Sequence, residues 1–413
     1  MKSGTGSRSD FARLLGAPAG MVAEPRGGAT VVWFGKPGKF MADLAVAAAQ
    51  GGPVLLASEA WGETERSQLA ALTIAAGNTP VHAAGRGWLG IPTGGSSGRL
   101  KFARHDEETI GAAVRGFAEH FGLAPVNAAG VLPLHHVSGL MAWMRCALTG
   151  GEYRPLDWKR VESGAGPRLG ERPAGWCLSL VPTQLERLLR TGQTLEWLRQ
   201  FRIIFVGGAP TASPLLDRAA SLGLPLSLGY GMTETAAMVT GLPPREFMAG
   251  ARHAGSTLPH ARVAIDHEGS IAVGGDSLFR GYWPEWRDGV DFLTGDRGWL
   301  NEAGQLHVLG RRDAVIITGG EKVDPAEVEH ALRQTGEFIE VVVTGAPDAE
   351  WGQVVVAAHP EATRPDLAKV NTALARTLAP AKRPKRFLAL PDWPVTEQGK
   401  VNRAEVVRRL TAR

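Results

Sequence analysis

The stretch Thr93-Gly94-Gly95-Ser96-Ser97-Gly98-Arg99-Leu100-Lys101 is the most informative segment of this chain. Its glycines let the backbone turn tightly and approach a ligand closely. Its hydroxyl and backbone N–H groups can point toward phosphate oxygens, and Lys101 ends the run with a positive charge. The spacing is not that of a Walker-type loop, because two residues separate the last glycine from the lysine and Phe102 follows where a hydroxyl residue is required. The stretch therefore predicts a polyphosphate-binding loop with a different frame.

Further motifs follow this loop in a fixed order: PLHHVSG at 133–139, GYGMTET at 229–235, TGD at 294–296, GRRD at 310–313, GGEKV at 319–323 and GK at 399–400. In this order they resemble the motifs of the adenylate-forming acyl-CoA synthetase family. The resemblance covers about residues 90 to 405 of the chain. It implies an enzyme that joins a carboxylic acid to ATP, releases pyrophosphate, and then passes the acyl group to the thiol of coenzyme A.

Length and composition are those of a globular enzyme with more than one domain. The chain has 413 residues, whereas single cores rarely grow past about 250–300 residues. A net charge of +4 does not indicate a nucleic-acid-binding protein, and no apolar run is long enough to predict a membrane span. The N-terminus lacks the apolar region of a secretory signal.

Cys146 and Cys177 have no metal-ligand spacing, so we expect reduced thiols in a cytoplasmic protein. A homo-oligomer is possible.

The middle of the chain predicts a parallel sheet. Apolar runs at 128–132, 176–181, 201–206 and 224–228 read as strands, and amphipathic segments at 140–148, from Pro182 onward and at 215–222 read as helices. Strands that alternate with helices favour a parallel sheet, whose ligands bind at the carboxyl ends of the strands. Gly207-Gly208-Ala209-Pro210 and Gly229-Tyr230-Gly231 fall at such ends.

Two flanking regions have other patterns. Residues 262–309 combine short apolar runs with turns at 267–269 and 301–304, which is typical of antiparallel hairpins. From Asp313 a small α+β module follows, with a helix at 325–332 and strands at 341–343 and 354–358. In the first 90 residues, strands at 30–34 and 54–57 and a helix at 40–50 are expected, and this region is shorter than is usual in the resembled family.

These patterns predict an α/β protein with two domains. A large N-terminal domain of mixed and parallel sheets with helices, including a β-rich subdomain, would span residues 1–311. A small mobile α+β domain, residues 312–413, would carry Lys400.

The resemblance assigns roles in phosphate chemistry to single residues. Glu234 would hold Mg²⁺, Thr233 would hydrogen-bond the α-phosphate, and Lys400 would bridge the attacking carboxylate and the α-phosphate. Such cations and donors offset the repulsion between two anions. The residues expected to bind the β- and γ-phosphates are Thr93, Gly94, Gly95, Ser96, Ser97, Gly98 and Lys101.

The resemblance also implies the nucleoside site. Asp296 would accept hydrogen bonds from the ribose hydroxyls, and Arg311 would reach the same region. Tyr230 would stack on adenine, which would lie close to backbone. The residues expected around the base are Gly207, Gly208, Ala209 and Gly231.

The second half-reaction has its own expected residues. His136 would line the acyl pocket and gate access of the thiol, and Asp313 stands at the family's hinge position. Lys322 stands where the family often carries Asn. The residues expected to face the coenzyme A tunnel are Gly319, Gly320, Glu321 and Lys322. The basic run at 382–386 reads as a solvated loop, with a landing site for the phosphates of coenzyme A as the alternative.

Each of these residues also has a plain structural interpretation. Asp296 after a glycine is a common turn residue, Glu234 suits a helix start, and His136 suits a satisfied core histidine. Lys400 could be an exposed lysine. Their order along the chain favours the functional interpretation, because context is what confirms a motif.

Two segments are similar to the o-succinylbenzoate–CoA ligases of menaquinone and phylloquinone synthesis: SLVPTQLERLL at 179–189 and IFVGGAP at 204–210. The substrate would be a dicarboxylate on an aromatic ring. Candidate donors for the ring carboxylate are Ser179, Thr183, Gln184 and His136, although these could equally be helix-start and polar-surface residues.

Three alternatives to this substrate and activity stay open. The chain could be another aryl- or acyl-CoA ligase. It could be an amino-acid-adenylating enzyme that loads a carrier protein, but no acidic residue is placed to pair with an amino group. It could be a non-catalytic nucleotide-binding scaffold, against which the presence of Lys400, Glu234 and Asp296 argues.

Overall fold

The computed structural model describes residues 7–18, 29–77, 86–93, 100–172, 174–312, 315–319, 321–348, 350–396 and 401–411. Some residues with expected roles lie outside these ranges: Gly94, Gly95, Ser96, Ser97, Gly98, Asp313, Gly320 and Lys400. For Lys322 only the backbone is described.

A four-stranded sheet opens the fold, in the order β1-β2-β3-β4. The first three strands are parallel, and β4 runs antiparallel to β3. Its strands are β1 (Thr30–Phe34), β2 (Val54–Ser58), β3 (Leu89–Thr93) and β4 (Lys101–His105). The helices of this region are α1 (Arg8–Leu14), α2 (Pro37–Ala49) and α3 (Glu63–Gly77). The expected strands at 30–34 and 54–57 and the expected helix at 40–50 are confirmed. Thr93 pairs with Lys101, so the two ends of the predicted phosphate loop are neighbours.

Helix α4 (Glu107–Phe121) was not predicted, although its boundaries are encoded locally. Asp106 caps its N-terminus by accepting a hydrogen bond from the Thr109 N–H at 3.0 Å, and Thr109 Oγ1 accepts one from the Asp106 N–H at 3.0 Å. Gly122 ends the helix with a left-handed φ of 60°, which glycine adopts without a steric cost. The helix packs against α5 and β10.

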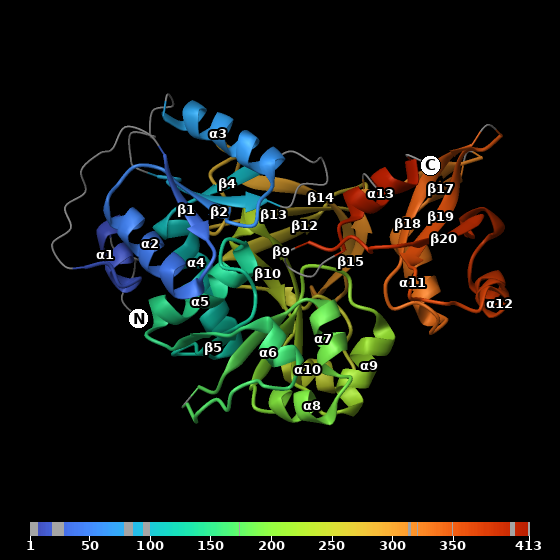
Figure 1. The fold of residues 1–413 in the computed structure, drawn as a ribbon, viewed down its shortest axis with the longest axis horizontal. Coiled ribbons are helices and arrows are strands. Elements are labelled where there is room, and N and C mark those ends of the chain that lie inside the picture. Colours follow the sequence, from blue (N-terminus) through green and yellow to red (C-terminus); the bar gives the residue numbers. More distant parts are fainter. Residues whose placement is uncertain are drawn as a thin grey trace.

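A seven-stranded sheet forms the centre of the fold, in the order β11-β10-β9-β8-β7-β5-β6. Strands β5 to β9 are parallel, as the alternating pattern predicted, and β10 and β11 are antiparallel additions. The strands are β5 (Ala128–Gly130), β6 (Tyr153–Pro155), β7 (Cys177–Leu180), β8 (Ile203–Val206), β9 (Leu226–Met232), β10 (Ala237–Gly241) and β11 (Ser256–Thr257). The helices are α5 (Val137–Thr149), α6 (Trp158–Glu162), α7 (Pro182–Leu188), α8 (Gly192–Leu198), α9 (Ser213–Ser221) and α10 (Pro244–Met248). Figure 1 shows α6 to α10 together below the centre of the molecule.

A third sheet is antiparallel throughout and confirms the hairpins expected at 262–309. Its strands, in spatial order, are β12 (Ala261–Ile265), β13 (Ser270–Gly275), β14 (Asp291–Leu300) and β15 (Leu306–Arg311). The register pairs Asp296 directly with Arg311.

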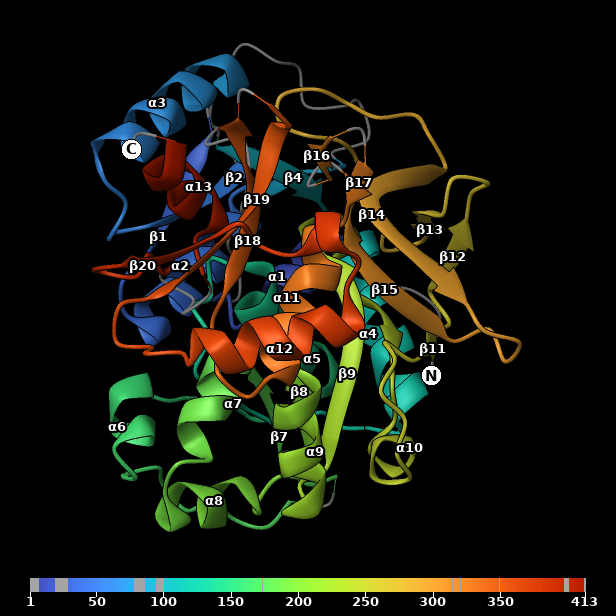
Figure 2. The same cartoon turned by 90° about the vertical axis from the view of Figure 1, so that its right-hand side faces the viewer.

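The C-terminal elements form the expected α+β module, at the right of Figure 1 and facing the viewer in Figure 2. They are β16 (Ile316–Thr318), β17 (Glu321–Val323), α11 (Pro325–Gln334), β18 (Val342–Asp348), β19 (Gly352–Pro360), α12 (Leu367–Thr377), β20 (Arg386–Leu390) and α13 (Arg403–Thr411). Two hydrophobic clusters of the module's own residues fill it, one around Val328, Val343 and Leu374 and the other around Val356 and Val406. Helix α11 packs against β15 of the large domain.

Two composition-based expectations can be compared with the structure. Cys146 and Cys177 are buried free thiols, and burial raises the pKa of each to about 12. In the described part of the chain no helix combines the length and apolarity that a membrane span requires.

Candidate active site

The antiparallel sheet places Asp296 beside Arg311, and Tyr230 reaches them from β9 of the central sheet. The Tyr230 hydroxyl donates to Asp296 Oδ2 at 2.6 Å, and Arg311 Nη1 lies 3.7 Å from Asp296 Oδ1. The Asp296 side chain is 15% exposed, so its carboxylate is reachable but held from two sides. Burial, and then the neighbouring Asp296 charge, raise the pKa of Tyr230 above its ordinary value, so the hydroxyl keeps its proton and acts as a donor. Three of the residues expected around the ribose and the base are therefore neighbours.

Two of the glycines expected around the base are required by space or by backbone conformation. A Cβ at Gly231 would lie 1.9 Å from the Ala237 carbonyl oxygen of the adjacent strand. Gly208, just after β8, has a φ of 80° and is exposed with Ala209. Both segments lie at the carboxyl end of a strand of the parallel sheet, as expected.

The Thr233-Glu234 pair lies in a short 3₁₀ turn after β9. The Glu234 carbonyl accepts from the Phe279 N–H at 2.8 Å, and Glu234 Oε1 accepts from the Tyr282 hydroxyl at 2.5 Å. On the other side, His105 Nε2 lies 2.8 Å from the Thr233 carbonyl oxygen. Burial lowers the pKa of His105 to about 4, so a neutral imidazole donates this hydrogen bond through Nε2. Neither His105 nor Tyr282 was predicted as part of the site.

Lys101 approaches the same group from the end of the predicted phosphate loop. Its Nζ lies 5.2 Å from the centroid of the Tyr282 ring. Residues 101 and 234, which are far apart in the sequence, therefore flank one tyrosine. The expectation that the loop and the Thr-Glu motif share a site agrees with this arrangement.

His136 is half-buried at the start of α5, beside His135. Its ring centroid lies 3.9 Å from that of His135, which in turn lies 5.2 Å from Phe34 and 6.3 Å from Trp61. Phe34 at the end of β1 and Trp61 in the loop after β2 thus lie beside His135. Sequence analysis did not identify His135, Phe34 or Trp61.

The candidate acyl-pocket residues of β7 and α7 differ from one another. Ser179 and Thr183 are half-buried. Gln184 is buried, and its side-chain oxygen accepts from the Val181 N–H at 3.1 Å, so it stabilises the N-terminus of α7. This is the helix-start role that sequence analysis kept as an alternative. Binding of a substrate carboxylate by Ser179, Thr183 or Gln184 stays a prediction.

Of the residues expected at the thiol tunnel, Gly319 directly follows β16, and Glu321 and Lys322 belong to β17. Gly319 has a φ of 57°, and its N–H donates to the Trp351 carbonyl oxygen at 2.9 Å. Glu321 is exposed. In the nearby basic run, Lys382 Nζ donates to both Glu327 oxygens at 2.7 Å, and Lys385 Nζ lies 5.4 Å from the Trp351 ring centroid. The run is therefore partly engaged by the module rather than fully solvated.

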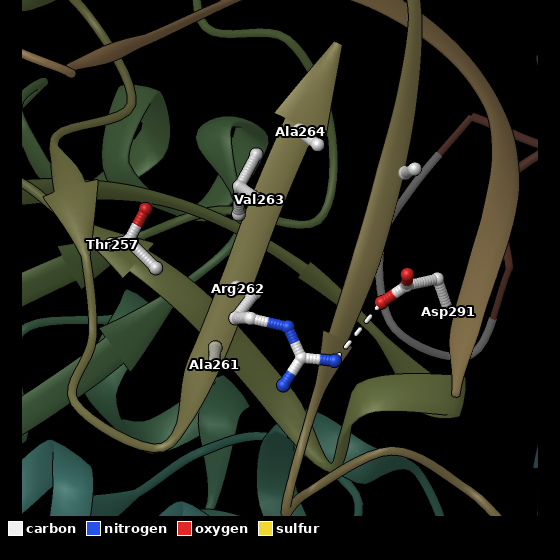
Figure 3. A pocket seen from close by; sticks show the side chains of 7 residues that line it. Thr257, Ala261, Arg262, Val263, Ala264 and Asp291 are labelled. Atoms are coloured by element: carbon white, nitrogen blue, oxygen red, sulfur yellow. Dashed lines mark hydrogen bonds and ion pairs between the residues drawn. The ribbon is translucent and has the colours of Figure 1, made fainter. Parts of the chain in front are cut away.

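A hollow of about 430 Å³ lies away from these motifs, on the antiparallel sheet (Figure 3). The ion pair between Arg262 Nη2 and Asp291 Oδ1, at 3.1 Å, crosses it. None of the residues with an expected role lines it, so its size carries no functional argument. The residues that line it are Thr257, Ala261, Arg262, Val263, Ala264, Ala272 and Asp291.

Comparison with protein families identifies two segments of the chain. Residues 57–283 match the family of AMP-binding enzymes, and residues 327–400 match the AMP-binding enzyme C-terminal domain. The chain belongs to the AMP-binding enzyme family. The first match contains the loop at 93–101, the Thr-Glu motif and Tyr282, and the second ends at Lys400.

Several curated relatives are CoA ligases. The chain is 32% identical over 288 residues to a 2-succinylbenzoate–CoA ligase of Listeria monocytogenes; the match includes 67% of this chain and 60% of the relative. It is 32% identical over 342 residues to an indoleacetate–CoA ligase of Aromatoleum aromaticum, covering 78% of this chain and 66% of that enzyme. The chain thus spans about 60% of the length of the first of these relatives.

Solved structures of AMP-binding enzymes share the fold. The o-succinylbenzoate CoA synthetase MenE of Bacillus subtilis, in complex with the acyl-adenylate OSB-AMP, matches 97% of this chain and 91% of its own with a TM-score of 0.72 and 22% identity. ATP-bound MatB of Rhodopseudomonas palustris matches 97% of this chain and 92% of its own with a TM-score of 0.74 and 24% identity. These likenesses confirm the predicted architecture of a large N-terminal and a small C-terminal domain.

Proposed function

We propose that this AMP-binding enzyme is an AMP-forming acid–thiol ligase that makes an acyl-adenylate and then an acyl-CoA thioester, with o-succinylbenzoate as the preferred acid. The observation that supports it most is the grouping of four charged residues from separate segments: Lys101 and Glu234 lie on either side of Tyr282, Asp296 pairs with Arg311, and the charge of Arg311 acts on Tyr282. Two cations and two carboxylates arranged in this way suit a nucleotide with its metal ion. We further propose that the small domain begins at residue 312 and that the enzyme is cytoplasmic.

The residues present suit Mg²⁺ as a companion of the nucleotide. No group of three or more potential protein ligands occurs among the described residues. Mg²⁺ ordinarily takes one or two carboxylates, several waters and substrate phosphates, so a single acid is enough. Glu234 is half-buried, and one of its oxygens is held by Tyr282. When bound, the ion would neutralise phosphate charge.

The proposed first half-reaction is an attack on phosphorus. A carboxylate oxygen of the acid attacks the α-phosphorus of ATP, the bond to the bridging oxygen of the β-phosphate breaks, and pyrophosphate leaves. Thr233 and Lys400 would stabilise the charge on the α-phosphate, while Lys101 with the loop at 93–98 would hold the β- and γ-phosphates. Asp296 and Arg311 would fix the ribose, and Tyr230 with the segments at 207–209 and 231 would hold adenine.

The proposed second half-reaction exchanges AMP for a thiol. The sulfur of coenzyme A, after losing its proton, attacks the acyl carbon, and AMP leaves. His136 would line the path to this carbon. Gly319 to Lys322 would face the incoming pantetheine after the small domain has rotated at Asp313.

The acid is inferred from the relatives and from the segment at 179–189. Several of the matched relatives are 2-succinylbenzoate–CoA ligases, whereas the indoleacetate–CoA ligase matches more of this chain. An arylacetate is therefore the second candidate. Of the two acids, only o-succinylbenzoate carries a carboxylate on its ring. Ser179, Thr183 and His136 would bind this group.

We expect o-succinylbenzoate to have the highest kcat/KM in a panel with indoleacetate, benzoate and a fatty acid. Benzoate lacks the succinyl arm, so it should be a poor substrate. Release of pyrophosphate, with and without coenzyme A, measures this. A higher kcat/KM for indoleacetate would favour the second candidate, and a higher value for benzoate or the fatty acid would contradict both.

We expect Asp296→Ala to raise the KM for ATP by roughly 10- to 100-fold, because hydrogen bonds to a charged group contribute about 1.5–3 kcal/mol each. The KM for the acid should change little. Asp291→Ala is the matched control, since Asp291 lies on the same strand with an exposed side chain paired to Arg262. If Asp296→Ala leaves the KM for ATP unchanged, Asp296 is a structural residue only.

A further inference from the structure

Tyr282 lies between two residues with proposed roles, and the mechanism above does not use it. Its hydroxyl donates to Glu234 Oε1 at 2.5 Å, and its ring centroid lies 5.2 Å from Lys101 Nζ. One side chain therefore contacts both the expected metal-binding acid and the expected phosphate-binding lysine.

The backbone around Tyr282 is fixed to strand β4. Tyr282 forms an isolated β-bridge with Ala103, the Trp283 N–H donates to the Phe102 carbonyl at 2.8 Å, and the Arg104 N–H donates to the Gly281 carbonyl at 2.9 Å. Residues 280–283 thus continue the sheet beside the strand that begins at Lys101. Main-chain hydrogen bonds consequently fix the backbone of Tyr282 beside the strand that carries Lys101.

Side chains strengthen this attachment on both sides. The Arg104 guanidinium lies 4.4 Å from the Trp283 ring and 5.1 Å from the Trp286 ring, and its Nη1 donates to the Pro284 carbonyl at 2.9 Å. Arg280 Nε donates to Asp106 Oδ2 at 2.9 Å. Such contacts hold the segment in place before any ligand binds.

We propose that Tyr282 is a positioning residue for the metal–nucleotide complex: its hydroxyl orients the Glu234 carboxylate toward the metal ion, and its ring face holds Lys101 beside the phosphates. The inference rests on the proposed function and adds to it the residue that couples the two halves of the phosphate site.

The chemistry of the pair suits this role. A phenolic hydroxyl can donate a hydrogen bond and an ionised carboxylate can only accept one, so the 2.5 Å contact runs from Tyr282 to Glu234 Oε1. A donor on Oε1 fixes the rotation of the carboxylate and leaves its other oxygen for the metal ion. An ammonium near the face of an aromatic ring is attracted by the ring's quadrupole.

Two substitutions separate the two contacts. Tyr282→Phe removes the hydroxyl and keeps the ring, whereas Tyr282→Leu removes both. Tyr153→Phe is the control, because Tyr153 lies on β6 in another sheet and loses a hydroxyl of the same kind. Thermal unfolding of each variant checks that the fold is retained.

The readout is equilibrium binding of ATP at increasing Mg²⁺ concentration, in the absence of acid and coenzyme A, so that it does not depend on turnover. We expect Tyr282→Phe to need about tenfold more Mg²⁺ for half-maximal binding, in line with loss of a hydrogen bond to a charged group, while binding without Mg²⁺ is unchanged. Tyr282→Leu should also weaken ATP binding without Mg²⁺. The Tyr153→Phe variant should match the unmodified protein.

Two other results would contradict the inference. They distinguish failure of the positioning role from failure of the proposed function. If the unmodified protein binds ATP with Mg²⁺ and Tyr282→Phe shows the same Mg²⁺ dependence, the positioning role is wrong and the proposed function stands. If the unmodified protein binds no ATP at any Mg²⁺ concentration, both are wrong.

Discussion

Lys400→Ala is expected to lower the rate of acyl-adenylate formation by about 10²- to 10³-fold, the effect typical of removing one group that stabilises developing charge. Adenylation brings an anionic carboxylate against an anionic phosphate, and Lys400 is the residue proposed to bridge them. The thiol attack on a finished acyl-adenylate does not need this bridge. The same variant should therefore convert supplied acyl-adenylate and coenzyme A to thioester at nearly the original rate.

A second variant tests whether the small domain moves between the two steps. Asp313→Pro fixes φ near −65° at the proposed hinge, so it should spare adenylation and slow thioester formation. Single-turnover kinetics of each half-reaction measure both effects. Lys369→Ala, which removes an exposed lysine paired with Glu337 in the same module, is the control. Equal loss of both steps in both variants would contradict alternation and leave Lys400 a structural lysine.

Asp106→Ala is expected to lower the free energy of unfolding by roughly 3 kcal/mol, because it removes a helix cap and a buried charged hydrogen-bond partner at once. Asp106 is 1% exposed, caps α4, and accepts from Arg280 Nε at 2.9 Å and from the Gly87 N–H at 3.1 Å. Denaturant unfolding measures the loss. The control is Asp157→Ala, which removes the cap of α6 at an exposed site and should cost about 1 kcal/mol or less.

The same aspartate predicts a pH dependence. Burial alone would raise the pKa of Asp106, but the hydrogen bond and charge of Arg280 and the N–H groups of Thr109 and Gly87 lower it below its ordinary value. Its contribution is therefore fully present above the unfolded pKa of about 4 and is lost as the pH falls through the lower folded pKa. Asp106→Asn keeps a capping group without the titration, so its stability should fall less steeply below pH 4. Parallel curves for the two proteins would show that Asp106 does not contribute to acid unfolding.

Local signals allowed much of the fold to be predicted. Strands β1, β2, β7 and β8 follow short apolar runs, and α11 follows a proline at its first turn. Helix α4 was missed although Asp106, its acidic first turn and Gly122 mark both ends. These capping signals are present in the sequence itself.

The candidate site also contains residues that the sequence predicts and residues that it does not. Asp296 and Arg311 could be predicted as neighbours, because a hairpin with a short turn joins their strands. Tyr282 and His105 could not, since their contacts with Glu234 and Thr233 arise from pairing between segments distant in the sequence. Such pairing has no periodicity that a single sequence displays. Gln184 shows the opposite case, in which a polar residue near the expected pocket serves its own helix.

The most direct test of the central claim is to identify the products by mass. The protein is incubated with ATP, Mg²⁺ and o-succinylbenzoate, first without coenzyme A and then with it. We predict o-succinylbenzoyl-adenylate and pyrophosphate in the first step, followed by its conversion to o-succinylbenzoyl-CoA and AMP in the second. Formation of ADP and phosphate, or the absence of an acyl-adenylate with every acid of the panel, would contradict the assignment of this chain as an AMP-forming acid–thiol ligase.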